Sequence, residues 1–293
     1  MNLTERRNCP ACASHRSKGI GEKNSYEILT CLECRTVFTA SLPAADEVQD
    51  YDEYYSEVNL SVPTHITKRV SEIVGGFSQF RKNGRFLDIG FGAGTILEAA
   101  AAQDWDVFGL EVSKPAVDQA RARGFKVFHG ALSDAEYSGG FFDVVTASEI
   151  LEHLESPDEV LKEIARIIRP GGLFWATTPS ATGISSRLLG TNWSVLTPPE
   201  HMQLYSSRGI IRMLQRAGFK SVNVKAHGTN PMEIVNHFRG NGNATQPFDR
   251  VQSSYALNEG MTKSPLRRRL RESINYTLSV SGLGDSLKIF ARK

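Results

Sequence analysis

The sequence has no long apolar run, few cysteines and little net charge, and each absence excludes a class of protein. Its apolar stretches are short and interrupted by polar residues, which excludes a transmembrane helix. The first residues contain no apolar segment typical of a secretory signal, so we expect a cytoplasmic protein. The 34 basic and 32 acidic side chains give a net charge of +2, which is too small for a dedicated nucleic-acid-binding protein.

The four cysteines all lie within the first 34 residues, in two pairs with the same internal spacing. They form a C-x2-C-x18-C-x2-C pattern, which falls in the spacing range of four-thiolate zinc sites. Two intervening residues allow one tight turn to present both sulfurs of a pair to one ion. Two disulfides or four unrelated thiols are the alternatives, and the lack of an export signal disfavours disulfides. We therefore predict a closed, structural zinc site at Cys9, Cys12, Cys31 and Cys34.

The cysteine segment, residues 1–41, is too small to fold without its metal, and its charge argues against a nucleic-acid surface. The segment has six basic and four acidic side chains, and four thiolates bound to one zinc ion add two negative charges, so the zinc-bound segment is close to neutral. The stretch from Asp46 to Glu57 then adds six acids and no base, which makes a poor surface for phosphate. We predict a structural or substrate-facing zinc ribbon.

From Arg85 onward, strand-like apolar runs alternate with helical segments. The predicted strands are 85–90, 106–112, 126–129, 141–148, 173–178, 219–226 and 286–292. Helices are predicted between them at 95–103, 113–123, 156–168 and 206–217. This alternation indicates an α/β fold with a largely parallel sheet covered on both faces.

A glycine-rich loop follows the first of these strands. It reads Asp88-Ile-Gly90-Phe-Gly92-Ala-Gly94, and glycines at such a turn allow the backbone to approach a ligand closely. Glu111 follows at the end of the second strand, where a carboxylate can accept both hydroxyls of a ribose. Tight turns also use glycine for steric reasons alone, so the prediction of a cofactor site depends on the loop, the two acids and the strand order together.

These motifs, with the run 142–149 and Arg169-Pro-Gly-Gly172, resemble those of class I S-adenosylmethionine (SAM)-dependent methyltransferases. The resemblance covers residues 83–226 and the last strand. It implies a Rossmann-like sheet with strand order 3-2-1-4-5-7-6, in which strand seven is antiparallel. The complete layout, with a zinc ribbon, a tyrosine-containing segment and a Pro-Pro-Glu-His motif, is similar to that of bacterial enzymes that methylate sugars, glycan precursors or other small molecules.

The resemblance also implies which residues bind SAM. The three loop glycines would contact the methionine part, Asp88 its amino group and Glu111 the ribose. Ala131 and Leu132 would border the adenine, although many relatives have an aspartate in this region. Around the sulfonium and the carboxylate of the cofactor the implied residues are Ser148, Glu149 and a tyrosine of the 51–55 segment, with Tyr55 as the candidate.

Two histidines follow predicted strand ends and are candidate general bases. His153 comes after the fourth strand, and His201 lies in Thr-Pro-Pro-Glu-His after the fifth. An imidazole can remove the proton of an acceptor hydroxyl near neutral pH, although either histidine could instead brace its loop. As an alternative, Glu149-x-x-Glu152-His153 resembles the metal-binding run of ubiquinone-pathway and small-RNA O-methyltransferases, to which His201 could add a ligand. That would place a second divalent metal at Glu149, Glu152 and His153, although many metal-free relatives share Glu-His-Leu.

Residues 228–284 form an insertion before the last strand. Lys263–Arg271 contains five basic and no acidic side chains within a predicted helical region. Three interpretations are open: a solvated helix face, a grip on an anionic acceptor, or peripheral contact with an anionic membrane.

The sequence therefore predicts three regions: a zinc ribbon at 1–41, an acidic, tyrosine-containing helical segment at 42–82, and a methyltransferase domain at 83–293. The expected activity is SAM-dependent methyl transfer to a small molecule, foremost a sugar hydroxyl of a glycan or nucleotide-linked precursor in glycan biosynthesis. The alternatives are an RNA methyltransferase that reads its substrate through the ribbon and a non-catalytic SAM-binding module. The oligomeric state is left open.

Overall fold

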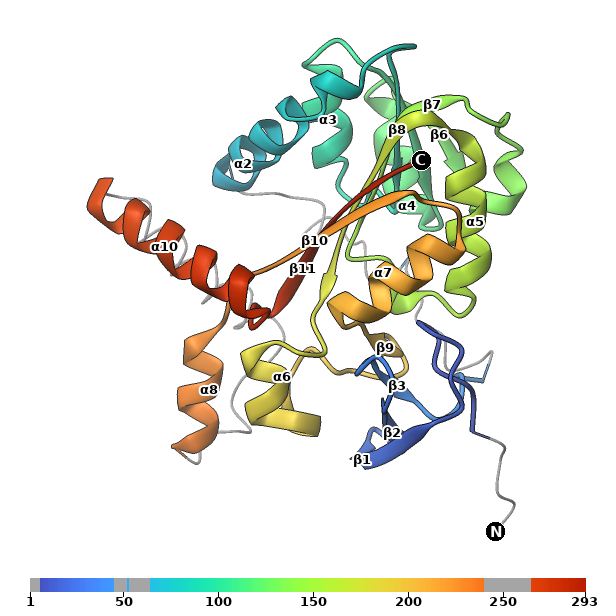
Figure 1. The fold of residues 1–293 in the computed structure, drawn as a ribbon. Helices are drawn as coiled ribbons and strands as arrows, with labels where there is room; N and C mark the ends of the chain where they lie inside the picture. The colour runs from blue at the N-terminus through green and yellow to red at the C-terminus, as the bar shows by residue number, and fades with distance from the viewer. Residues whose placement is uncertain (1–5, 45–51, 53–63, 240–264) are drawn as a thin grey trace. The chain divides into compact units, whose positions relative to one another are not determined.

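The computed structural model describes residues 6–44, 52, 64–239 and 265–293 (Figure 1). The chain divides into two compact units: unit 1 comprises residues 1–48, 178–212 and 224–288, and unit 2 comprises residues 49–177, 213–223 and 289–293. Strands β8 (Ile168–Pro179), β10 (Ser221–His227) and β11 (Ser286–Arg292) each begin in one unit and end in the other. The predicted regions 1–41, 42–82 and 83–293 follow sequence motifs rather than these units, and they stay predictions.

A seven-stranded sheet has the order β10-β11-β8-β7-β4-β5-β6, which confirms the predicted Rossmann-like fold and its strand order. Its other strands are β4 (Arg85–Ile89), β5 (Asp106–Glu111), β6 (Lys126–His129) and β7 (Phe142–Ser148). Strands β6, β5, β4, β7 and β8 pair in parallel. Strand β11 is antiparallel to its neighbours. The amides of Gly171 and Lys220, near the starts of β8 and β10, donate to the carbonyls of Lys293 and Arg292 at the end of β11.

The helices of unit 2 bury apolar side chains between themselves and the sheet. They are α2 (Thr64–Gly75), α3 (Thr95–Ala101), α4 (Lys114–Ala122) and α5 (Pro157–Ile167), and α7 (Ser207–Arg216) ends in this unit. On α5, Leu161, Ile164 and Ala165 recur at helical spacing and are all buried. Around the strands, a core cluster gathers Phe86, Trp105, Val144, Trp175 and their neighbours. This packing holds the ends of the strands in fixed positions.

Strand β8 begins five residues earlier than the predicted strand 173–178. The Arg-Pro-Gly-Gly motif lies inside β8 because Gly171 and Gly172 pair with the C-terminal Lys293. Arg169 forms an ion pair with the buried carboxylate of Asp143, which also accepts the amides of residues 82–84. This motif therefore joins strand ends at the amino edge of the sheet, opposite the edge where such folds bind ligands.

Unit 1 contains a four-stranded antiparallel sheet in the order β1-β2-β3-β9. Strands β1 (Ser17–Lys23), β2 (Tyr26–Cys31) and β3 (Val37–Thr39) come from the cysteine segment, whereas β9 (Gln203–Leu204) follows the Pro-Pro-Glu-His motif. The apolar core beneath the sheet combines Tyr26 and Ile28 with Trp193, Leu196 and Leu204. The ribbon thus builds its sheet and core with residues far along the chain.

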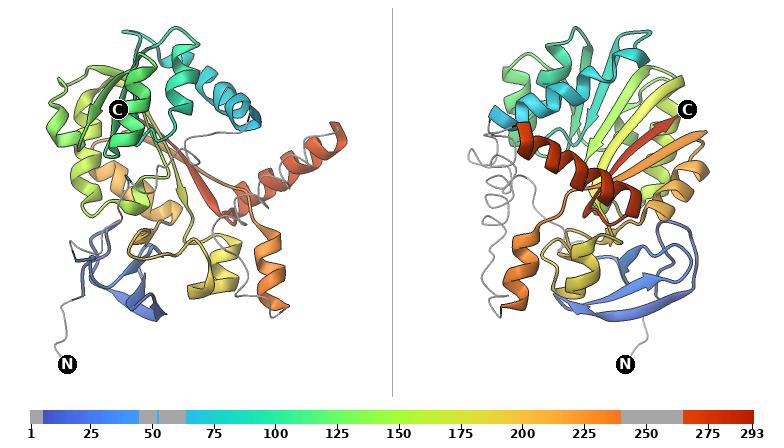
Figure 2. Two further views of the ribbon diagram at one scale, coloured as in Figure 1. Left: turned by 180° about the vertical axis from the view of Figure 1, so that it is seen from behind. Right: turned by 60° about the vertical axis from the view of Figure 1, so that its left-hand side comes forward.

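The remaining helices of unit 1 are α6 (Ile184–Leu189), α8 (Pro231–Phe238) and α10 (Pro265–Ser281), with a 3-10 turn at Gly190–Asn192. Helices α8 and α10 lie between β10 and β11 in the chain, and Figure 2 shows both from two further directions. In the part of the chain that the structure describes, no helix has the length and apolarity needed to cross a membrane.

Candidate functional site

The glycine loop after β4 has a backbone that only glycine adopts easily. Gly90, Gly92 and Gly94 have φ angles of +65°, +50° and +77°, in the left-handed region. A side chain at Gly90 would also require Ile150 to move, because a Cβ would lie 2.2 Å from its Cδ1. Gly94 directly precedes α3. The loop therefore brings bare backbone to the carboxyl edge of the sheet, at the start of a helix.

Glu111 lies at the end of β5, and the backbone holds its carboxylate in place. One oxygen, Oε2, accepts the amide of Gly92 at 2.9 Å, and the other accepts those of Val112 at 2.8 Å and Ser113 at 3.1 Å. The residue is only 3% exposed. Each carboxylate oxygen can accept more than one hydrogen bond, so the two oxygens can also take a pair of ribose hydroxyls.

Asp88 lies at the end of β4 and is buried. Its Oδ1 accepts a hydrogen bond from Oγ1 of Thr146, its partner across the β4–β7 pair, at 2.6 Å. Burial raises the pKa of Asp88 to about 7; the hydrogen bond from Thr146 opposes this shift and the charge of Glu111 adds to it. A buried acid of this kind gains by binding a cation such as an ammonium group. Sequence analysis missed Thr146, although pairing β4 with β7 would have indicated it.

The other predicted cofactor residues lie along the same edge in unit 2. Ala131 is exposed and Leu132 is buried in the turn after β6. Ser148 ends β7 with its hydroxyl 2.9 Å from that of Thr177, and Glu149 follows it with a φ of +55°. Tyr55, like Tyr51 and Tyr54, lies outside the described residues. The remaining residues proposed for SAM thus follow four neighbouring parallel strands, which is where such sheets bind ligands.

The two candidate histidines belong to different units. His153 is half-buried in a 3-10 turn (Leu151–His153) of unit 2, next to the fully buried Glu152. The possible ligand atoms of Glu149, Glu152 and His153 do not all lie within 4.8 Å of one another. The three residues predicted to bind a second metal are therefore not brought together.

His201 belongs to unit 1, and its neighbour fixes its tautomer. Its Nδ1 lies 2.5 Å from the carbonyl oxygen of Val195, and since a carbonyl only accepts, Nδ1 must carry the hydrogen. In the neutral ring the lone pair is then on Nε2, the arrangement that a general base needs.

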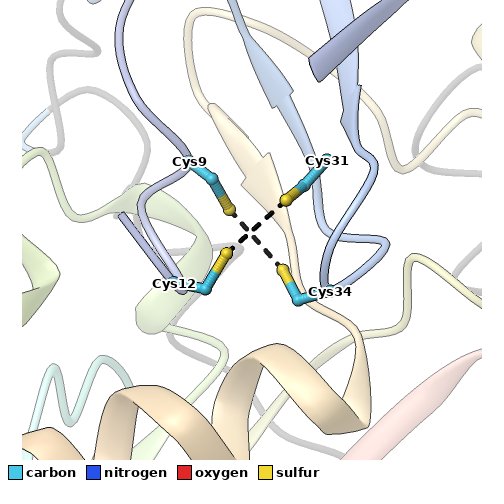
Figure 3. A group of neighbouring side chains, drawn as sticks. All are labelled: Cys9, Cys12, Cys31 and Cys34. Carbon is cyan, nitrogen blue, oxygen red and sulfur yellow. Dashed lines mark hydrogen bonds between the residues drawn. The ribbon is translucent and has the colours of Figure 1, made fainter. Parts of the chain in front are cut away.

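The four cysteines converge as their spacing predicts (Figure 3). Their sulfurs all lie within 4.8 Å of one another, with 3.6 Å between Cys9 and Cys34 and 3.5 Å between Cys12 and Cys31. A tetrahedral zinc with bonds of about 2.3 Å separates its sulfurs by about 3.8 Å, so these two pairs need only a small expansion. The hydrogen bond with Cys9 lowers the pKa of Cys34 to about 5 and raises that of Cys9, which favours one thiolate in the pair. All four are unbridged by disulfides.

Hydrogen bonds join the cysteine segment to the segment around His201. Arg7 donates through Nε to the carbonyl of Thr39 and through Nη2 to the carbonyl of Met202 and the side chain of Gln203, at 2.7 to 3.1 Å. Burial lowers the pKa of Arg7 to about 10. Ser206 donates to the carbonyl of Cys34 and accepts the amide of Gly209 at the start of α7. Neither contact between the two segments had a signal in the sequence, since 195 residues separate Arg7 from Met202 and 172 separate Cys34 from Ser206.

The other end of the same segment is held by the β1–β2 turn. Lys23 donates to the carbonyl of Trp193 at 2.9 Å, and Nδ2 of the Asn24 side chain donates to the carbonyl of Pro198 at 2.8 Å. The segment from Trp193 to Ser206, which we call the histidine loop, is therefore attached to the ribbon at both ends. The contacts position the loop without using the metal ligands' side chains.

Comparison with known proteins shows the family to which the chain belongs. The profile of the family described as "Methyltransferase domain" matches residues 61–224, more than half of the chain. The ubiquinone biosynthesis O-methyltransferase of Thiobacillus denitrificans is 29% identical over 164 residues, which cover 52% of this chain and 71% of the relative. The 27-O-demethylrifamycin SV methyltransferase of Amycolatopsis mediterranei is 32% identical over 133 residues, covering 41% and 49%.

A solved structure shares the fold. A SAM-dependent methyltransferase from Archaeoglobus fulgidus superimposes with a TM-score of 0.55 at 18% identity, covering 83% of this chain and all of the other. At this identity the likeness supports the fold alone. The family match includes the glycine loop, Glu111 and both candidate histidines, whereas the ribbon and helices α8 and α10 lie outside it.

Proposed function

The chain belongs to the methyltransferase-domain family and is a SAM-dependent methyltransferase, and we propose that it methylates a hydroxyl oxygen of a small molecule. The observation that carries this proposal is Glu111, a buried carboxylate anchored by three amides beside the bare glycine loop. Transfer to oxygen is supported by the relatives in ubiquinone and rifamycin biosynthesis.

In this proposal SAM, when bound, supplies a sulfonium methyl group as the electrophile. Glu111 binds the ribose, Asp88 attracts the amino group, and the glycine loop lets the cofactor approach the backbone. Ala131 and Leu132 border the adenine, while Ser148 and Glu149 border the reacting end. The protein's remaining task is to align the acceptor and remove its proton.

His201 is the proposed general base. The support for it is the Nδ1 contact with Val195, which leaves the lone pair of the neutral ring on Nε2. His153 is the second candidate, because it follows β7, whose end borders the cofactor edge. A base in either position contributes roughly 10²–10⁴-fold to the rate, so its removal should lower kcat far more than it weakens SAM binding.

We also propose that Zn²⁺ occupies the four-cysteine group and has a structural role. Four thiolates close the coordination shell and leave no position for a substrate. The ion would fix the two cysteine turns, and through Arg7, Ser206 and Lys23 the ribbon would brace the histidine loop. The ribbon would then affect turnover without contacting the acceptor.

The chemical class of the methyl acceptor is the most detailed part of the proposal. A sugar hydroxyl of a glycan or nucleotide-linked precursor remains our candidate, beside the hydroxyls of other small molecules. RNA is the alternative class, and a non-catalytic SAM-binding module is the alternative to an enzyme. One experiment separates them: zinc-loaded protein is incubated with methyl-labelled SAM and a panel of nucleotide-sugars, phenols and RNA, and the products are identified by mass.

We expect label in a hydroxylated small molecule, and loss of most turnover in His201→Ala with an unchanged Kd for S-adenosylhomocysteine. His15→Ala, which removes an exposed ribbon histidine of the same unit, is the matched control and should keep full activity. Label in RNA alone would favour the RNA alternative. Tight cofactor binding with no product across the panel would favour the non-catalytic module.

A further inference from the structure

The insertion at residues 228–284 is described in part. Residues 240–264 lie outside the described residues, and of the five basic side chains in the run 263–271 only that of Arg269 is described. Contact of this run with an anionic acceptor or a membrane therefore stays a prediction. Helix α8 is described over its full length, and it lies beyond the family match, which ends at residue 224.

Helix α8 inserts one acidic side chain into unit 1. The helix lies beside α6 (Figure 1), and Ile234 packs against the apolar cluster beneath the ribbon sheet. Oδ1 of Asn230 accepts the amide of Glu233 at 3.4 Å and so caps the first turn. Glu233 is only 7% exposed, and a carboxylate buried to this degree needs hydrogen bonds or an opposite charge. Its contacts therefore indicate what the helix holds in place.

One peptide group of the histidine loop is held at both ends by opposite charges. The amide of Ser194 donates to Oε1 of Glu233 at 2.9 Å. The carbonyl of Trp193 accepts a hydrogen bond from Nζ of Lys23, also at 2.9 Å. This carbonyl and this amide belong to the same peptide bond, because Trp193 directly precedes Ser194. The two charges reach it from β1 and from α8, which are remote from each other in the chain.

The placement of the two charges allows only one orientation of this peptide. Burial lowers the pKa of Lys23, and the negative charge of Glu233 opposes this shift, so the two side chains also interact with each other. The ammonium faces the carbonyl oxygen and the carboxylate faces the amide, and both hydrogen bonds are strengthened by the charge. A reversed peptide would bring the carboxylate against the carbonyl oxygen and the ammonium against the amide hydrogen.

The orientation of this peptide determines the turn that follows it. The carbonyl of Trp193 also accepts the amide of Leu196 at 3.1 Å, which closes a four-residue turn. Val195 is the third residue of this turn, and its carbonyl oxygen lies 2.5 Å from Nδ1 of His201. Hydrogen bonds and one short turn therefore connect the two charges to the imidazole ring.

We propose that Lys23 and Glu233 are positioning residues for His201. By fixing one peptide orientation they hold the turn, and the turn holds the carbonyl that keeps the hydrogen on Nδ1 of the ring. Nε2 then stays available to accept the proton of the methyl acceptor. The insertion would thus contribute to turnover through α8. The effect on turnover rests on the proposed role of His201 as the base, whereas the position of the ring hydrogen is measured without any acceptor.

The direct test is nitrogen NMR of the full, zinc-loaded chain labelled at its histidines. The signals of His201 are those absent from His201→Asn, and at a pH where the ring is neutral they should show the hydrogen on Nδ1. Glu233→Met removes the acceptor of the Ser194 amide, so the ring should shift to a mixture of both tautomers. Glu233→Gln keeps an acceptor oxygen and should retain the Nδ1–H form. The same tautomer in Glu233→Met and the unchanged protein would overturn the proposal.

An exchange of the two charges tests the direction of the clamp. Lys23→Glu combined with Glu233→Lys restores two opposite charges but reverses their positions on the peptide, so the Nδ1–H form should be lost. Its recovery would show that attraction between the charges matters rather than the peptide orientation, which would also overturn the proposal. Lys23→Met loosens the clamp from the other end and should give the same mixture as Glu233→Met. Zinc content and urea titration check that each variant folds.

Turnover provides a separate readout. With the panel of nucleotide-sugars, phenols and RNA as acceptors, Glu233→Met should lower kcat at least about tenfold and leave the Kd for S-adenosylhomocysteine unchanged. Glu22→Met and Lys18→Met remove an exposed acid and an exposed base of β1, and both controls should keep full kcat and the Nδ1–H form. A changed tautomer with an unchanged kcat would uphold the clamp and contradict His201 as the base, so the two proposals fail separately.

Discussion

The cofactor edge of unit 2 and the histidine loop of unit 1 are built in opposite ways. The cofactor edge uses residues 88–149, which follow neighbouring parallel strands in chain order. The histidine loop is held by side chains from the first 39 residues, about 170 to 195 positions away. A site made by successive strand ends needs only its own sheet, whereas one joined across the chain depends on a remote element. Damage to the ribbon should therefore affect catalysis and leave cofactor binding intact.

The largest expected effect is loss of the proposed zinc. Cys31→Ser, or chelation of the metal, should cost several kcal/mol of stability in unit 1, because structural zinc supplies about 10–16 kcal/mol of apparent binding energy. Turnover should disappear while S-adenosylhomocysteine still binds. Mass spectrometry measures the zinc content, denaturant titration the stability, a methyl-transfer assay the turnover and calorimetry the binding of S-adenosylhomocysteine. Equal zinc content in Cys31→Ser and the unchanged protein would remove the metal from the account.

Arg7→Met should have the next largest effect, about 3 kcal/mol of destabilisation. The change leaves the buried carbonyls of Thr39 and Met202 without their charged donor. The matched control is Arg16→Met, which removes an exposed ribbon arginine paired with Glu33 and should cost about 0.5 kcal/mol or less. Urea titration and steady-state kinetics of both variants provide the comparison. If Arg7→Met kept full kcat, the ribbon would not brace the histidine loop.

Gly90→Ala should damage the cofactor edge instead. The added methyl group meets Ile150 and requires a left-handed backbone, which costs about 1–3 kcal/mol. We expect the Kd for S-adenosylhomocysteine to rise by roughly 100-fold, since bare backbone is lost from the loop. Gly124→Ala has a similar φ of +84° but open space around it, so it should show the backbone strain without the binding defect. Similar Kd values in the two variants would show that the loop does not contact the cofactor.

The smallest effect is a pH dependence from Asp88. Its pKa is raised to about 7, so its contribution to stability is present below the ordinary value of 3.8 and is lost as the pH rises through 7. Cofactor binding should change in the opposite direction, because only the ionised carboxylate attracts the ammonium group. Affinity for S-adenosylhomocysteine should rise by up to roughly tenfold between pH 6 and 8. Asp88→Asn should flatten this profile, and an unflattened profile would assign the titration to another group.

Much of the fold could be predicted from the sequence because most strands and helices of unit 2 follow one another along the chain as short alternating segments. The strands at 85–89, 106–111, 126–129 and 142–148 agree with the predictions to within one residue at each end. The C-terminal strand at 286–292 agrees as well. Strand β8 was predicted too short, since its extra residues pair with the end of the chain rather than follow an apolar pattern.

The cofactor edge and the cysteine group were predictable for the same reason, because short spacings and strand ends determine where their side chains lie. The bracing of the histidine loop was not. Arg7 resembles any charged residue beside a cysteine, and β9 has only two residues, too few for a periodic pattern. The exposure of Met232, Val235 and Phe238 on α8 also required the structure, because their spacing predicts a buried face.

The most direct test of the account is calorimetric titration of the full chain with S-adenosylhomocysteine, comparing the unchanged protein with Glu111→Ala. The account predicts micromolar binding that weakens at least about 30-fold in the variant, because Glu111 would bind both ribose hydroxyls. Glu111→Ala must retain the folding cooperativity of the unchanged protein in a denaturant titration. No binding to the unchanged protein, or the same Kd in both proteins, would contradict a cofactor site at the carboxyl ends of β4 and β5.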